Sequence, residues 1–419
     1  PNDLVKKDVL DIYRNNSLLF RQFAPVYRPG AVYVVTPDSH RLGASVWSVV
    51  EATLYAMQLM ISSHADFGVL NEADLRIPET ARALFFPVPF AITQDCYEKL
   101  RGFVKKGGTL YISGDLSYDM TRQRTLTNRL EELCGVRFIR ENYPNIARSE
   151  PVLVRRAGLK LPDCLGHPCI QVEPIEAAVL AEDEQGRPVI LVHALGRGQV
   201  IFNMDPIELA ASHWPEEKDV TLYKAVLNRA GVRRLAIEPD HPRLHYFQQP
   251  CQNGIAVHVV FNAQDDGTET VKLPEIGDGI RMEVRANRPG LAAVGRDGAL
   301  LALESQGRAE LGGKTLWETT GHLISYTLDK RDLRSSCRFV LLPNEPQQMR
   351  MHVPRVHTPT VLIGEVENGR WNTYGRLQPP CPNGWLTLSV DDVSARCIFI
   401  VCEDGEEEKA IRNFMAIYG

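Results

Sequence analysis

The chain has 419 residues, of which 44% are hydrophobic, so it can hold two or three domains with cores of their own. Its net charge is −5 and its basic residues are spread along the chain, which argues against nucleic acid as a partner. The most apolar segment, residues 44–63, includes Glu51, Gln58 and several serines. We interpret it as a buried helix of a soluble domain, and we expect no contact with a membrane.

The N-terminal segment carries apolar residues at helical spacing between residues 3 and 24. We expect residues 1–25 to be a helical tail that continues a domain of a longer protein, because the helical pattern of apolar residues is already present in the first residues of the sequence. The nine cysteines, an odd number, lie mostly within apolar runs such as LEELCGV. Buried reduced thiols of this kind are typical of a cytoplasmic protein.

The next segments alternate between strands and helices. A strand is expected at about 31–36, and a helix at about 44–63 whose all-round apolar character indicates burial in a core or in a subunit interface. The runs ALFFPVP and TLYIS predict two buried strands, joined by an amphipathic helix that Thr93 or Asp95 caps. Strands joined in this way are parallel. Further along, the pattern predicts helices at about 122–134 and 219–230, with short strands and turns between about 151 and 205.

From about residue 234 the pattern changes to β with almost no helix. Short apolar runs recur between Gly, Pro, Asn and Asp residues, which is typical of β-sandwich modules. We expect one β-sandwich domain at 234–345 and a second β module at 346–419 that ends in a short helix. The whole chain therefore has the fold class α/β plus all-β.

The corner after the strand TLYIS is the first candidate site. It holds Ser113, Gly114 and Asp115, and ligands bind at the carboxyl ends of strands in doubly wound sheets. A glutamine-hydrolysing domain would place a nucleophilic cysteine here, but the sequence has none at this position, and Ser113 lacks the G-x-S-x-G pattern of a serine nucleophile. We therefore expect a structural corner, in which Asp115 caps backbone amides of its own loop.

A second candidate lies at the end of the first strand, in TPDSHRLG. Asp38 and His40 could join Ser113 and Asp115 in a hydrolase or amidase site at the sheet edge, although an exposed strand end has the same polar composition. The later segment NMDPIELAASHWPEE offers Asp205, Glu208 and His213, without the spacing of a known catalytic pair.

A third candidate is a metal site in DCLGHPC, formed by Cys164, His167 and Cys169. Zinc sites usually need two such pairs, and the sequence has no second pair nearby, so we expect ordinary loop residues, no metal and no cofactor.

The β region also offers aromatic residues. Trp317, Trp371 and Trp385 could form a platform on which sugars stack, or could belong to the core or rim of the sandwich.

The order of elements in residues 26–233 resembles one family. This order resembles the glutamine-amidotransferase-like trimerisation domain of bacterial β-galactosidases and related glycoside hydrolases. The elements that carry the resemblance are the strand, the buried helix, ALFFPVP, the amphipathic helix, KKGGTLYISGD, LCGVRF and the hairpin at 186–203. Residues 321–344 are similar to a segment of the C-terminal β-domains of such enzymes. The resemblance implies a flavodoxin-like, class I glutamine-amidotransferase-like doubly wound domain followed by β-sandwich domains.

The resemblance also implies a function. Enzymes of that family carry their two catalytic glutamates on an N-terminal TIM barrel, and residues 1–25 look like its last helix, so no catalytic residue can be carried over to this chain. Partners would be other copies of the chain, in a homo-oligomer that is a trimer in that family, together with the missing barrel and carbohydrate. The leading prediction is an accessory, oligomerising region of a glycoside-hydrolase-like protein. A stand-alone hydrolase or amidase and a carbohydrate-binding module are the alternatives.

Overall fold

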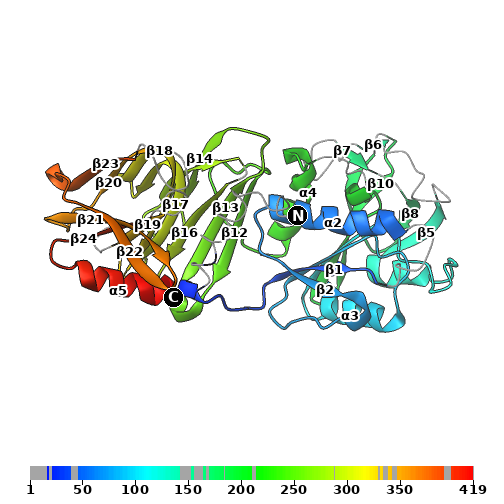
Figure 1. The fold of residues 1–419 in the computed structure, drawn as a ribbon. Coiled ribbons are helices and arrows are strands. Elements are labelled where there is room, and N and C mark those ends of the chain that lie inside the picture. Colours follow the sequence, from blue (N-terminus) through cyan, green and yellow to red (C-terminus); the bar gives the residue numbers. More distant parts are fainter. Residues whose placement is uncertain are drawn as a thin grey trace, which may run out of the picture. The chain divides into compact units, whose positions relative to one another are not determined.

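Figure 1 shows the fold of the chain, a computed structural model. The chain divides into two compact units, an α/β unit of Pro29–Leu235 with His241–Arg243, and a β unit of Pro1–Arg28, Ala236–Asp240 and Leu244–Gly419. Among the described residues, no helix combines the length and apolar character that crossing a membrane requires. The structure describes residues 17, 21–38, 46–141, 152–154, 164–166, 169–183, 185–209, 214–286, 288–328, 331–333, 338–341, 347–390 and 398–418.

The α/β unit is built on a seven-stranded sheet with the order β2-β1-β3-β4-β11-β10-β9. Neighbouring strands from β2 to β11 are parallel, whereas β10 runs antiparallel to both β11 and β9. The expected parallel pair is confirmed, because Phe85 of β3 lies beside Tyr111 of β4. The strands are β1 Val32–Thr36, β2 Gly68–Asn71, β3 Ala83–Pro87, β4 Thr109–Ser113, β9 Ala178–Glu182, β10 Pro188–Leu195 and β11 Gly198–Asn203.

Helices cover both faces of this sheet. The helix α3 (Gln94–Lys105) packs on one face, whereas α2 (Val46–Ser62) and α4 (Glu217–Arg229) pack on the other. Alternate residues of one strand enter the two cores, since Tyr33 belongs to the core under α3 and Val34 to the core under α2 and α4. Burial on both faces explains why these strands are continuous apolar runs in the sequence.

One predicted helix is much shorter than expected. The pattern predicts a helix at about 122–134, but helical residues begin only at Asn128 and lead into the π-helix Leu130–Cys134, which Gly135 closes with φ +67°. The carboxylate of Asp119 accepts hydrogen bonds from the backbone N–H groups of Thr121 and Gln123, at 2.9 and 3.0 Å. Side-chain bonds of this kind offer the backbone an alternative to helix, so the preceding segment folds as a loop.

The smaller elements of the α/β unit lie around this frame. Two short two-stranded sheets join β5 to β8 and β6 to β7. These elements are β5 Val136–Glu141, β6 Val152–Val154, β7 Cys164–Gly166, β8 Ile170–Pro174 and the 3₁₀ turns η1 Glu72–Asp74 and η4 Ile207–Leu209.

The β unit is one connected sheet of 13 strands, and its strand pairs are antiparallel. Strands from both sides of the expected boundary at 345/346 share this sheet, since β24 pairs with β19 and β20 pairs with β18. The bounds are β12 Leu244–Pro250, β13 Ala256–Asn262, β14 Thr268–Leu273, β15 Ile280–Arg285, β16 Pro289–Val294, β17 Leu300–Leu311, β18 Lys314–Thr327, β19 Arg338–Leu341, β20 Gln347–His352, β21 Pro359–Glu367, β22 Arg370–Leu377, β23 Trp385–Val390, β24 Ile398–Glu403 and α5 Glu407–Tyr418.

Residues 21–28, which precede the first strand of the α/β unit, belong to the β unit. The ring of Phe23 is 2% exposed and lies in the same core as Ala410 and Phe414 of the C-terminal helix α5. The backbone N–H of Val26 donates to the carbonyl of Pro250, at 2.9 Å. The chain therefore contributes to the β unit before it enters the α/β unit.

Candidate functional site

The corner after β4 is held closed by its own backbone. Ser113 is fully buried, and the N–H of Val88 donates both to its carbonyl oxygen, at 3.1 Å, and to its hydroxyl oxygen, at 3.3 Å. The N–H of Gly114 donates to the carbonyl of Asn203 on β11, at 2.8 Å. Gly114 has φ +86°, a left-handed conformation that favours glycine. The hydroxyl that could act as a nucleophile is thus packed among neighbouring strand ends.

Asp115 is buried and committed to its own loop. One carboxylate oxygen accepts from the backbone N–H of Ser117, at 2.9 Å, as the sequence predicts. The other accepts from the guanidinium of Arg124, at 2.5 Å, an ion pair that the sequence does not indicate. Burial raises the pKa of Asp115, while the charge of Arg124 and the hydrogen bonds from Ser117 act in the opposite direction. Both oxygens are therefore used in stabilising the corner.

Arg124 connects the corner to the neighbouring strand β5. Its guanidinium donates to the hydroxyls of Ser117 and Tyr118, at 3.0 and 2.6 Å, and forms an ion pair with Glu141, at 3.2 Å. The same group lies over the rings of Tyr118 and Phe138, with centroid distances of 4.5 and 4.3 Å. A planar cation that both stacks and donates is well suited to this position. The arrangement fixes the loop that follows β4.

A second buried acid lies near Ser113. Glu208, in η4, is 1% exposed, and one of its carboxylate oxygens accepts from the hydroxyls of Tyr111 and Tyr223, at 3.0 and 2.8 Å. Burial raises the pKa of Glu208, and its hydrogen bonds with Tyr223, Tyr111 and Ser113 oppose this. Burial thus makes the carboxyl of Glu208 harder to ionise than an exposed one. Asn203 donates to the Tyr111 hydroxyl, at 3.1 Å, so the group is a hydrogen-bonded link between β4, β11 and α4.

The other residues of the proposed hydrolase site have separate contacts. The backbone N–H of Asp38 donates to a carboxylate oxygen of Glu72, at 3.0 Å, and the N–H of Thr93 donates to the other oxygen, at 3.2 Å. Glu72 is 1% exposed and so ties the end of β1 to the start of α3. His40 lies outside the described residues, so its pairing with Ser113 stays a prediction.

Three residues at this edge were missed by the sequence reasoning or left without a role. Glu72, Arg124 and Glu208 are buried or nearly so, but each lies in a polar segment that looks like an exposed loop. The sequence carries no signal for Glu72, because the amides it binds belong to Asp38 and Thr93, 34 and 21 positions away. Arg124 binds Asp115 within its own loop and Glu141 on β5, but its residue type alone does not distinguish it from an exposed base. Glu208 stands out only as one acid within NMDPIELAASHWPEE.

Among the proposed metal ligands, only the side chain of Cys169 is described. Burial raises the pKa of the Cys169 thiol well above its usual value, and the negative charges of Asp115 and Asp205 add to this. A protonated thiol is a poor metal ligand and a poor nucleophile. His167 and the side chain of Cys164 lie outside the described residues, and within the described part of the chain no three His, Cys, Asp or Glu side chains are arranged to hold a metal ion.

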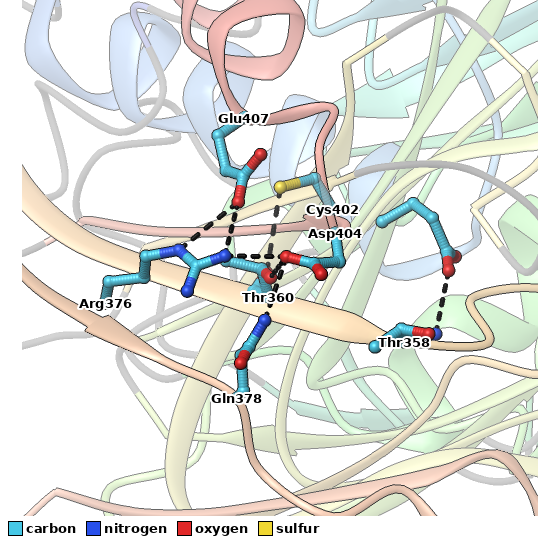
Figure 2. A network of polar contacts seen from close by, with 8 residues as sticks. Thr358, Thr360, Arg376, Gln378, Cys402, Asp404 and Glu407 are labelled. Atoms are coloured by element: carbon cyan, nitrogen blue, oxygen red, sulfur yellow. Dashed lines mark hydrogen bonds and ion pairs between the residues drawn. The ribbon is translucent and has the colours of Figure 1, made fainter.

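The β unit has a polar network of its own, which Figure 2 shows. The guanidinium of Arg376 on β22 contacts Asp404, at 2.6 Å, and Glu407 at the start of α5, at 2.8 Å. Asp404 also accepts from Gln378, at 2.9 Å, and from the hydroxyl of Thr360, at 3.2 Å. These contacts join β21, β22 and the first turn of α5, so the network attaches the C-terminal helix to the sheet.

The three tryptophans proposed as a sugar platform are engaged in packing. Trp317 is fully buried and donates to the hydroxyl of Ser305, at 3.0 Å. Trp371 packs edge-on against Phe414 of α5, with ring centroids 5.3 Å apart. Trp385 has the guanidinium of Arg350 over its ring, at 4.4 Å, and the ring of His352 beside it, at 5.0 Å. The geometry favours the alternative in which these residues belong to the core and rim.

No protein-family model matches the chain, and no curated protein matches it. Solved structures do. The β-galactosidase from Rahnella sp. R3 has a TM-score of 0.51 and 15% identity, covering 63% of this chain and 40% of the other. The β-galactosidase from Bacillus circulans sp. alkalophilus has a TM-score of 0.49 and 16% identity, and the match covers 63% of this chain and 41% of that one. The α-L-fucosidase isoenzyme 2 from Paenibacillus thiaminolyticus has a TM-score of 0.46 and 11% identity, and the match covers 94% of this chain and 51% of that one.

The likeness to the Rahnella enzyme shows that the chain has a β-galactosidase-like fold over 63% of its length. The matched region spans about 40% of the length of the β-galactosidases.

Proposed function

We propose that this chain is an accessory region of a glycoside-hydrolase-like protein, that it acts by self-association through the α/β unit and by support of carbohydrate processing through the β unit, and that a separate catalytic barrel performs the chemistry. The observation that carries the proposal is the β-galactosidase-like fold over 63% of the chain. The buried thiols among the described cysteines support a cytoplasmic location.

The strand order supports the finer assignment of the α/β unit. Its five parallel strands, β2-β1-β3-β4-β11, follow the order 2-1-3-4-5 of flavodoxin-like folds. The antiparallel strands β10 and β9 extend this order. The likeness to β-galactosidases and this topology together favour the trimerisation-type domain that the sequence resembles.

The corner supports an accessory role over a stand-alone hydrolase. Ser113 is fully buried, its hydroxyl accepts from the N–H of Val88, and the nearby carboxyl of Glu208 is buried as well, which raises its pKa. Nucleophilic catalysis needs a hydroxyl within reach of both substrate and an unprotonated base. We interpret the corner as the remnant of an ancestral site.

The purified chain is expected to show no turnover of aryl-galactosides or other aryl-glycosides. A general acid and a nucleophile supply most of a glycosidase's rate, which amounts to many powers of ten. The assay compares the chain with a complete β-galactosidase at equal concentration. A Ser113→Ala variant separates contamination from a site within the chain. Turnover that persists through purification and is lost in Ser113→Ala would sink the accessory role and favour the hydrolase.

A further inference from the structure

Five basic side chains lie at the edge of the seven-stranded sheet where its parallel strands begin. Arg82 directly precedes β3 and Arg197 directly precedes β11, and because β4 lies between these strands, they start roughly 10 Å apart. Lys105 and Lys106 lie at the end of α3, and Arg229 ends α4. All five residues are exposed. We call these five residues the basic edge.

Hydrogen bonds hold the segments of the basic edge side by side. The carbonyl of Lys105 accepts from the backbone N–H of Arg197, at 3.2 Å. The side-chain amide of Gln199 donates to the hydroxyl of Thr109, at 3.3 Å, and to the carbonyl of Arg229, at 3.4 Å. The five cations therefore share one surface of the α/β unit, although they come from segments far apart in the sequence.

The basic edge has almost no negative charge of its own. In the described part of the chain, no carboxylate oxygen lies within 4.0 Å of its five charged groups. The segments 78–82, 102–109, 195–199 and 227–234 contain one acidic residue, Glu79. A cation near the C-terminal end of a helix is favoured by the helix dipole, which accounts for the three basic residues at helix ends. It does not account for the two arginines that precede strands.

A surface of this kind attracts a negatively charged partner. Cations roughly 10 Å apart are separated by little more than the Debye length of about 8 Å at physiological salt, so they repel one another and act together on an approaching charge. The whole chain has a net charge of −5, so the basic edge is opposite in sign to the chain as a whole. Complementary charges of this kind set the rate and the register of association.

The β unit carries a surface of the opposite charge. Residues 403–408 have the sequence EDGEEE, the densest acidic run in the chain, and we call them the acidic run. The side chains of Asp404 and Glu406 are 42% and 43% exposed. Figure 2 shows that Arg376 lies against part of this segment. With Arg376 and Lys409 counted against its five acids, the acidic run keeps a net charge of −3.

We infer that the basic edge of one copy of this chain binds the acidic run of a second copy. The inference rests on the proposed self-association and gives it two surfaces. Because the two surfaces differ, the contact is heterologous, and copies joined head to tail close into a ring where the rotation between them allows it. A ring of three copies agrees with the trimer that the sequence resemblance implies.

Charge reversal tests the basic edge. Arg82→Glu combined with Arg197→Glu changes the two arginines that lie outside helices, so the helix dipoles are not affected. Each exposed ion pair has a modest effect on affinity, but reversal replaces attraction by repulsion at two positions, so the dissociation constant should rise about tenfold or more. The matched control is Arg122→Glu combined with Arg140→Glu, which changes the net charge equally at two residues outside the basic edge.

Sedimentation of the full chain across a concentration series gives the dissociation constants. The wild type and the control should associate alike, and both should dissociate more readily as the salt concentration rises from about 0.05 to 0.5 M. The variant with the reversed basic edge should need about tenfold more protein to associate. Thermal melting of each variant checks its fold.

A mixture of variants tests the partner. Glu406→Lys combined with Glu408→Lys reverses the acidic run and should also weaken association on its own. An equimolar mixture with the variant of the basic edge should associate again, because every contact between unlike copies joins opposite charges. Recovery in the mixture requires contact between two chains. The neutral variant, Glu406→Gln combined with Glu408→Gln, should weaken association less, and it tests the acidic run even if reversed charges disturb the first turn of α5.

The outcomes separate this inference from the proposed self-association. An oligomer that reversal of the basic edge leaves intact overturns the inference but keeps self-association. A wild type that stays monomeric at all concentrations overturns both. Folded variants that dissociate alone and do not recover when mixed overturn the acidic run as the partner.

Discussion

Removal of the Asp115 carboxylate should destabilise the α/β unit more than any other single change at the corner. Asp115→Ala leaves Arg124 without its shortest ion pair, at 2.5 Å, and the N–H of Ser117 without its acceptor. A hydrogen bond to a charged group contributes about 1.5–3 kcal/mol, and the bond from Ser117 adds about 1 kcal/mol. Arg124 keeps Glu141, so we expect about 3 kcal/mol in all, near the lower limit of about 3–5 kcal/mol for breaking a buried pair.

The loss can be measured as a shift of the unfolding transition of the α/β unit. For a unit of about 200 residues, 1 kcal/mol shifts Tm by about 2–4 °C, so Asp115→Ala should lower Tm by roughly 6–12 °C. Ser113→Ala is the matched neighbour. It removes a neutral hydrogen bond to the N–H of Val88 and should cost about 1 kcal/mol. Calorimetry and urea unfolding, with the slope compared between variants, give both values.

A double-mutant cycle isolates the ion pair. Burial raises the pKa of Asp115, which means that the ionised carboxylate has a desolvation cost that Arg124 offsets only in part. Asp115→Ala combined with Arg124→Met should therefore cost less than the sum of the two single changes, with a coupling of about 2 kcal/mol. If Asp115→Ala changes stability by less than about 0.5 kcal/mol, or if the two changes simply add, the corner is not held by this pair and the reasoning fails.

Two further predictions concern the β unit. Phe23→Ala should cost about 3–5 kcal/mol and lower the unfolding transition of the β unit while leaving that of the α/β unit in place, because Phe23 is buried beside Phe414; equal shifts in both transitions would contradict this. Burial lowers the pKa of His258 to about 4 in the folded chain. Between about pH 6.5 and pH 4 the unfolded chain therefore binds a proton at this residue that the folded chain does not bind. Stability should fall as pH drops from about 6.5 toward 4, and His258→Gln should flatten that slope in urea titrations at several pH values.

Local chemistry made much of the α/β unit predictable. The runs ALFFPVP and TLYIS are mostly apolar because both of their faces are buried, and their short length favours strands over helices. Thr93 caps α3 with its hydroxyl, which accepts from the N–H of Cys96, at 3.2 Å, as the residue type predicts. These features depend on neighbours within a few positions, so a single sequence carries them.

The sequence-based predictions fail where the structure depends on contacts between distant segments, or where two local interactions compete. The helix expected at 122–134 fails because Asp119 binds the amides of Thr121 and Gln123, a competition that hydrophobic periodicity does not register. Arg124 reads as an ordinary exposed base, yet its partner Glu141 is 17 positions away on β5. Cys169 comes close enough to the corner for the charge of Asp115 to raise its pKa, although nothing near position 169 indicates this. Pairings of this range require the fold itself.

The corner shows why a binding topology need not imply a binding site. In an open α/β sheet, ligands gather at the carboxyl ends of the strands because backbone N–H groups and polar side chains are available there. In this chain several of those groups are used internally. The N–H of Gly114 is taken by Asn203, that of Val88 by Ser113 and that of Ser117 by Asp115. A ligand would have to replace each bond with one at least as good, and would have to separate Asp115 from Arg124 as well. Such a corner gains more from stability than from recognition, which favours a scaffold over an enzyme.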